Sequence, residues 1–140
     1  MDDKGRVKLP TKFQEYFNAQ PERTLFVTSL DRRIAQIYSI GLWKENEKLF
    51  ATFRTDPKAA RNIAFNAADL GAEVEMDSQG RVLFSTELRR ELGIENAPVR
   101  LLWYRGHVEV LSEKIYEERK QQATQNVEED LSKLEAAGLN

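Results

Sequence analysis

Short apolar or alternating runs, each bounded by turn-forming residues, recur along the chain. Four of them predict β-strands by their length and their content of Val, Ile, Leu and aromatic residues. They cover residues 24–27, 34–38, 99–104 and 107–111. A fifth run at 71–76 alternates strictly, so we expect it to lead as a strand into the turn that begins at Asp77.

Segments whose apolar residues have helical spacing lie between or beside these predicted strands. Phe13, Tyr16 and Phe17 stand at i, i+3 and i+4, and Thr11 has Gln14 three residues later, the spacing of a capping box. We therefore expect a short helix there. Longer helices are predicted over 42–53, from Asp56-Pro57 to near Gly71, and over 113–137, the last with the apolar line Tyr116, Ala123, Val127, Leu131 and Leu134. The mixture predicts an α+β fold.

The chain contains an internal repeat at an offset of 75 residues. Residues 2–11 align with residues 77–86, and Asp, Gly, Arg, Val and Thr recur at identical spacing. The register continues with Phe13 over Leu88 and with Phe17 over Leu92. Each half is therefore predicted as turn, strand, short helix, strand, turn, strand and long helix.

The repeated motif has the composition of a turn. Asp2 and Asp77 can cap the turns with their carboxylates, and Gly5 and Gly80 can supply the positive φ that such turns need. An Arg follows four residues after each Asp, and it can close the turn as a salt bridge, contact a phosphate or base, or do both.

Cations gather around the first motif. We expect Lys4, Arg6 and Lys8 to form a compact basic tip, with Lys12 on the following helix either reaching a phosphate or remaining solvated. Residues 77–87 hold Arg81 as their sole cation. These five residues are the candidate DNA-binding residues, and the first motif is expected to contribute more than the second.

The net charge of −2 conceals a gradient along the chain. Residues 1–40 carry seven Lys and Arg against five Asp and Glu, whereas residues 111–140 carry four against seven. A weak overall charge is compatible with DNA binding, because local patches set the field near a phosphate. It argues against tight binding by a single chain.

Several functional classes are disfavoured by composition. The chain has no cysteine and one histidine, so it offers no nucleophile–base pair and no His/Cys metal cluster. We expect no enzyme activity, no cofactor, no metal and no small-molecule substrate. We also expect no signal peptide, no membrane contact and a cytoplasmic location. His107 is expected to pack or lie at the surface.

The doubled Asp-x-x-Gly-Arg motif at this spacing resembles the MraZ family, over nearly the whole chain. The resemblance implies two tandem halves of the AbrB-like swapped-hairpin type that form an intrachain pseudo-dimer. It also implies assembly into a ring and binding to direct repeats upstream of the family's own division and cell-wall operon. The family positions fall on Asp2, Lys4, Gly5, Arg6 and Pro10, and on Asp77, Gly80 and Arg81.

Two departures from the family pattern bear on this expectation. Gln79 stands where the first motif has Lys4, which predicts that the second half binds phosphate less tightly. The family also has a strand before its first motif, where this sequence begins at Met1. Either the sequence starts late or the first half lacks that strand.

The resulting hypothesis divides the chain into a first half (1–55), a connecting helix (56–70), a second half (71–112) and a C-terminal helix (113–140). It predicts a nucleoid-associated regulator of transcription that binds double-stranded DNA as a closed homo-oligomer, with Trp43, Phe50 and Phe53 in the core or at a subunit interface. The alternative is a ring-forming structural or adaptor protein whose basic tips bind an acidic protein partner.

Overall fold

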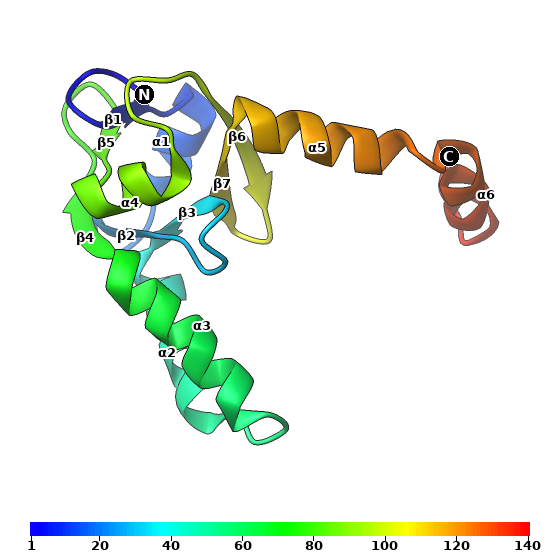
Figure 1. The fold of residues 1–140 in the computed structure, drawn as a ribbon, viewed down its shortest axis with the longest axis horizontal. Coiled ribbons are helices and arrows are strands. Elements are labelled where there is room, and N and C mark those ends of the chain that lie inside the picture. The colour runs from blue at the N-terminus through cyan, green and yellow to red at the C-terminus, as the bar shows by residue number, and fades with distance from the viewer.

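The computed structural model describes residues 1–140 and has an α+β fold (Figure 1). The first half consists of β1 (Arg6–Lys8), α1 (Thr11–Asn18), β2 (Thr24–Thr28), β3 (Ala35–Ser39) and α2 (Ile40–Thr52). Then follow α3 (Pro57–Leu70) and β4 (Ala72–Glu75). The second half consists of β5 (Arg81–Leu83), α4 (Thr86–Leu92), β6 (Val99–Tyr104), β7 (His107–Ser112), α5 (Glu113–Thr124) and α6 (Val127–Ala136). The order of elements predicted for the two halves is confirmed.

The strands form two antiparallel sheets that alternate between the halves. The larger sheet has the order β4-β2-β3-β7-β6, so equivalent hairpins meet along β3 and β7. The smaller sheet pairs β1 with β5, and Val7 stands opposite Val82, its equivalent at the offset of 75. Both pairings are antiparallel and join equivalent strands of the two halves.

The two outer edges of the larger sheet differ. β4 covers the outer edge of β2, with Leu25 opposite Val74. The equivalent edge of β6 has no partner in residues 1–140, because no strand precedes the first turn there. The outer edge of β6 is therefore an unpaired edge of the larger sheet.

Both halves contribute to one core. The main cluster of buried apolar residues draws on both small strands, on all the inner strands and on the two short helices. Its fully enclosed members include Leu9, Phe84 and Leu88. A second cluster is built around Trp43, whose indole stacks on Phe26 with ring centroids 4.5 Å apart.

Helix ends follow the sequence in most places. Asp56 caps α3 through its side chain with Pro57 in the first turn, as predicted. The capping box expected at Thr11 is wrong: Pro10 stands at the N-cap, and the Gln14 amide instead donates to the Leu9 carbonyl oxygen at 2.7 Å.

Two helical arms leave the body of the molecule in different directions (Figure 1). One is the hairpin of α2 and α3, and the other is α5 followed by α6. The single helix expected over 113–137 is interrupted at residues 125 and 126, where Asn126 leaves the helical conformation (φ −127°, ψ 42°). No helix has both the length and the apolar character needed to cross a membrane.

The shared core makes a direct prediction about stability. Leu88→Ala should lower the free energy of unfolding by about 2–5 kcal/mol, since Leu88 is fully buried and its removal leaves a cavity between the halves. Leu83→Ala, at a residue that is 49% exposed, is the matched control and should cost far less. Urea denaturation measures both, and equal losses would contradict a core shared at Leu88.

Candidate nucleic-acid interface

The two Asp-Arg turns have the same internal hydrogen bonds. Asp2 Oδ1 accepts from the backbone N–H groups of Lys4 (3.0 Å) and Arg6 (2.8 Å), and its Oδ2 accepts from Arg6 Nε at 2.8 Å. Asp77 makes the equivalent bonds, with 2.8 Å to Arg81 Nε. The expected salt bridge that closes each turn is therefore confirmed.

These bonds stabilise the ionised carboxylates. The backbone N–H of Arg6, together with its guanidinium and the N–H of Lys4, lowers the pKa of Asp2 to about 2 against the opposing effect of burial. The pKa of Asp77 is lowered by the corresponding groups, chiefly the backbone N–H of Arg81. Each carboxylate thus stays charged and holds its Arg in place.

A glycine is needed in both turns. Gly5 and Gly80 have φ of +82° and +77°, a conformation that L side chains rarely adopt. There is also no room for a side chain: a Cβ on Gly5 would collide with the Arg89 guanidinium, and one on Gly80 would collide with the Gln14 amide.

Each turn is completed by the opposite half. The N–H of Phe84 donates to the Gly5 carbonyl oxygen, and the N–H of Leu9 donates to the Gly80 carbonyl oxygen, both at 2.9 Å. Since β1 and β5 are antiparallel, the first turn lies beside the end of β5 and the second beside the end of β1. The two turns therefore flank one short ladder, about 10 Å long at the usual rise per residue.

This arrangement separates cations that the sequence predicted to lie together on one basic tip. Lys8 is at the end of β1, and its ammonium donates to the backbone carbonyl oxygen of Gln79 in the second turn. The expectation that Lys8 joins Lys4 and Arg6 around the first turn is wrong, because the ladder carries Lys8 across to the other half. Lys12 is exposed on α1, which follows β1.

Arg89 is the residue that sequence reasoning missed. Its Nη1 donates to the Lys4 carbonyl oxygen and its Nη2 to Thr86 Oγ1, both at 3.0 Å. Its Nε is buried without a partner. The signal was the repeat itself, because Arg89 aligns with Gln14, the residue that packs on the second turn.

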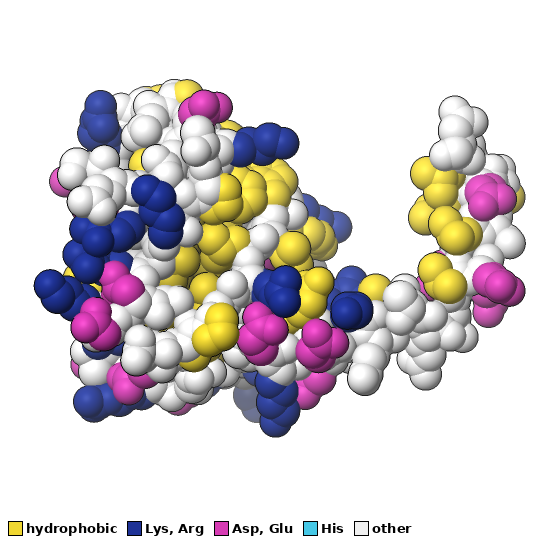
Figure 2. Space-filling view, turned by 90° about the horizontal axis from the view of Figure 1, so that it is seen from above, with side chains coloured by type: hydrophobic (Ala, Val, Ile, Leu, Met, Phe, Trp, Pro, Cys, Tyr) yellow, Lys and Arg dark blue, Asp and Glu magenta, His cyan; other side chains and the backbone are white.

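The cations of the two turns are therefore more balanced than the sequence suggested. Lys4, Arg6 and Arg89 meet at the first turn, while Arg81 and Lys8 meet at the second. Lys and Arg side chains are visible at the end of the molecule opposite the C-terminal arm, interspersed with carboxylates (Figure 2).

Other arginines have structural partners. Arg32 binds Asp69 of α3 and Glu91 of α4, each at 2.8 Å. Arg33 binds Glu118 of α5 at 2.7 Å. The loop between β2 and β3 thus ties three helices to the body. His107 packs against Tyr38, with ring centroids 4.7 Å apart, and burial lowers its pKa.

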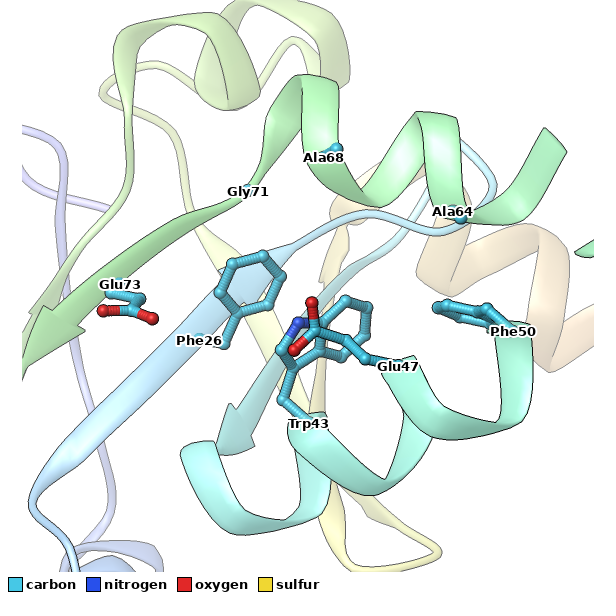
Figure 3. Close-up of a pocket in the computed structure, with 8 residues that line it drawn as sticks. All are labelled: Phe26, Trp43, Glu47, Phe50, Ala64, Ala68, Gly71 and Glu73. Carbon is cyan, nitrogen blue, oxygen red and sulfur yellow. The ribbon is translucent and has the colours of Figure 1, made fainter. Parts of the chain in front are cut away.

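A polar pocket lies against the first turn and is lined by Asp2, Asp3, Gly5, Arg89, Glu95 and Asn96. No group of three or more metal-ligating side chains is placed to hold an ion. A second pocket, between β2, β4, α2 and α3, is lined mainly by apolar side chains together with Glu47 and Glu73 (Figure 3). It belongs to the helical hairpin rather than to the turn surface.

The chemistry available at the turns is that of anion recognition. The Nε of each motif Arg is taken by its Asp, while the Nη atoms make no hydrogen bond within the chain and remain available to a planar pair of acceptors. Fold and site together define the class: an internally duplicated α+β protein whose two cation-bearing turns share one surface.

Known relatives make the assignment more specific. The protein called transcriptional regulator MraZ from Caldanaerobacter subterraneus is 32% identical over 118 residues, 84% of this chain and 79% of that protein. The MraZ of Thermomicrobium roseum is 33% identical over 115 residues, 80% and 75% of the two chains. The chain belongs to the MraZ family.

The MraZ of Acidobacterium capsulatum is 36% identical over 89 residues, which span 64% of this chain and 61% of that protein. No protein-family model matches the chain. The relatives are named as transcriptional regulators, which are not enzymes.

The lowered pKa of Asp2 predicts how the first turn responds to acid. Its folded pKa of about 2 lies below the ordinary 3.8, so its contribution to stability is present above pH 3.8 and is lost as the pH falls toward 2. The stability difference between wild type and Asp2→Asn should shrink over that window in urea titrations.

The exposed neighbour Asp3 provides the control for this measurement. Asp3→Asn should follow the wild-type pH profile through the same window. If the gap between wild type and Asp2→Asn were independent of pH from 5 to 2, the ionised Asp2 would not stabilise the turn.

Proposed function

We propose that this chain is a sequence-specific DNA-binding regulator of transcription, acting in the cytoplasm in association with the nucleoid. The relatives named as transcriptional regulators support this proposal, and it rests above all on one observation. Two turns with the same internal hydrogen bonds, each bearing an arginine, flank one short ladder, β1–β5, in a family of regulators.

The fold proposal is a pair of AbrB-like swapped-hairpin halves that form an intrachain pseudo-dimer. Its support is the exchange of strands between halves: β1 pairs only with β5, and each turn receives a hydrogen bond from the other half. The units are residues 1–55, with their first strand absent as given, and residues 71–112. Residues 56–70 connect them, and residues 113–140 form the C-terminal helices.

The DNA-contacting residues of this proposal are Lys4, Arg6, Lys8, Lys12 and Arg81, with the turns set by Asp2, Gly5, Asp77 and Gly80. Lys and Arg neutralise phosphates and position a protein without reading sequence, whereas a fork of Arg N–H groups can also take the O6 and N7 of guanine. Arg6 and Arg81, each 26% exposed, are restrained by their Asp and are the better candidates for base contacts. The lysines suit phosphate.

Avidity completes the proposal. A chain with a net charge of −2 binds DNA weakly alone, so several turn surfaces in a closed homo-oligomer would engage DNA together. We propose a ring that binds direct repeats upstream of its own division and cell-wall operon. No cofactor, small-molecule substrate or membrane is required.

DNA binding should fail in a residue-specific manner. Gel shifts with the DNA upstream of the chain's own gene should show losses for Arg6→Ala, Arg81→Ala and Lys8→Ala, since both turns carry cations. Loss of a base contact should relax sequence preference by about 1–3 kcal/mol against a scrambled duplex. Loss of one phosphate contact should flatten the salt slope by about one unit and weaken binding to both duplexes.

Lys114→Ala, on the exposed face of α5, is the matched control for a lost positive charge. It should leave both affinity and salt slope unchanged. Salt-independent effects of equal size for all four variants would show that the turn residues act structurally. No shift of the upstream DNA at low salt would overturn the DNA proposal and favour an acidic protein as the partner.

The oligomer can be tested separately from DNA. Sedimentation velocity at micromolar concentration should show a closed assembly larger than a dimer, because exposed apolar residues remain on both arms. Arg6→Ala should not change its size, since Arg6 lies on the turn surface. A monomer at micromolar concentration would contradict the proposal of a ring.

A further inference from the structure

All four backbone polar groups of Lys4 and Gly5, at the centre of the first turn, are hydrogen-bonded. Their two N–H groups donate to Asp2, at 3.0 Å to its Oδ1 from Lys4 and at 3.2 Å to its backbone oxygen from Gly5. The Gly5 carbonyl oxygen accepts from the backbone of the opposite half. The Lys4 carbonyl oxygen accepts from Arg89 Nη1 at 3.0 Å, so a cation of the opposite half supplies the last of the four bonds.

The second turn has the same four bonds. The N–H groups of Gln79 and Gly80 donate to Asp77, at 2.9 and 3.0 Å, and the Gly80 carbonyl oxygen accepts from the opposite half. The Gln79 carbonyl oxygen, the counterpart of that of Lys4, accepts from the ammonium group of Lys8. At both turns the carbonyl oxygen before the glycine is therefore bonded to a cation of the opposite half.

The two cations do not occupy equivalent positions of the repeat. At the offset of 75 residues, Arg89 corresponds to Gln14, and Lys8 corresponds to Leu83. The Gln14 amide donates to Leu9 of its own half, and the Leu83 side chain has no donor. Arg89 reaches its turn from α4, whereas Lys8 reaches the other turn from β1. What the two turns share is the positive charge at this carbonyl oxygen, not the element that supplies it.

The Arg89 side chain is oriented by its own helix. At the start of α4 the Ser85 side chain accepts from the N–H of Leu88, and Leu88 is fully buried in the core. Arg89 Nη2 donates to Thr86 Oγ1 at 3.0 Å. The guanidinium lies directly over Gly5, where an added Cβ would be 2.8 Å or less from three of its side-chain atoms. Arg89 is thus in place before any ligand binds.

The surroundings of Arg89 favour a positioning role over direct contact with DNA. The polar pocket beside the first turn is lined in part by Arg89 and by the carboxylates of Asp2, Asp3 and Glu95. Carboxylates beside the guanidinium repel a phosphate and weaken a direct contact. Both Nη atoms already donate within the chain, and Nε is buried. The bond from Arg89 to the turn is consequently its main interaction at this surface.

We propose that Arg89 is a positioning residue of the DNA-binding site and acts through Lys4 and Arg6 of the opposite half. This inference rests on the proposed function and adds a residue to it. By binding the Lys4 carbonyl oxygen, Arg89 fixes the segment that carries both side chains, so less conformational freedom is lost when they meet DNA. Lys8, besides its proposed phosphate contact, holds the second turn in the same manner beside Arg81, its cross-strand neighbour.

Double-mutant cycles on DNA affinity test which turn each cation serves. In gel shifts with the DNA upstream of the chain's own gene, Arg89→Met should weaken binding by about tenfold, the effect of losing one charge-assisted hydrogen bond. The loss should be much smaller when Lys4→Ala and Arg6→Ala are also present than when Arg81→Ala is, because the first turn is then already impaired. For Lys8→Met, the loss should be smaller with Arg81→Ala than with Arg6→Ala.

Conservative and control variants separate positive charge from packing. Arg89→Lys keeps a charge and an N–H donor, so it should bind DNA more tightly than Arg89→Gln, which introduces the residue that the first half has at this position. Arg90→Met removes a charge from the same helix, from a side chain that pairs with Glu95 at 3.4 Å, and should bind as the wild type does. Wild-type affinity in Arg89→Gln would contradict the need for a charge.

The hydrogen bond itself can be measured without DNA. The nitrogen chemical shift of a backbone amide responds to bonding at the preceding carbonyl oxygen. Arg89→Met should therefore move the Gly5 resonance more than that of Gly80, and Lys8→Met should do the reverse. Since the bond from Arg89 to Lys4 is at an exposed position, water can replace the lost donor and the chain should stay folded. An unmoved Gly5 resonance in folded Arg89→Met would overturn the proposed bond.

The outcomes separate this inference from the proposed function. If Arg89→Met weakened DNA binding equally in the first-turn and second-turn backgrounds, Arg89 would act only on the fold as a whole. That result would overturn the inference while DNA binding stands. A wild-type chain that does not shift the DNA would overturn both.

Discussion

Two backbone hydrogen bonds, from Phe84 to Gly5 and from Leu9 to Gly80, make the halves interdependent. A turn in one half is closed by the strand of the other, and the three-residue strands β1 and β5 have no other sheet partner. Buried amide and carbonyl groups are costly when unpaired. Neither half can therefore keep its turn, its short strand and its helix packed without the other, and Val7, Leu9, Val82 and Phe84 form one core rather than two.

Hydrogen bonds within each turn explain how a small protein holds arginines in place at its surface. An isolated surface ion pair contributes only about 0–1 kcal/mol and orders its side chains poorly. Here Asp2 is already oriented by two backbone N–H groups, so its second oxygen meets Arg6 in a fixed position. The function of the ion pair is consequently positional: it reduces the side-chain freedom that would be lost on binding a partner.

The sequence predicted local features well and long-range placement poorly. The Asp-Arg turns, their glycines and the cap at Asp56 follow from interactions within a few residues, and the structure has them all. The position of Lys8 depends on which strand β1 pairs with, 71 residues away at Gln79, and no local pattern contains that information. The same applies to Arg32, whose partners come from α3 and α4, and to the break between α5 and α6, where the apolar line packs against nothing that would keep the helix continuous.

The approximate two-fold axis through the Val7–Val82 pair has a consequence for directionality. Backbone related by such an axis presents the same shape to a partner approached from either end, so it cannot distinguish the two orientations. Polarity must come from equivalent positions at which the side chains differ, and four of them surround the ladder: Lys4 and Gln79, Lys8 and Leu83, Lys12 and Glu87, Gln14 and Arg89. These differences between the two copies of the repeat make the two ends of the symmetric scaffold chemically distinct.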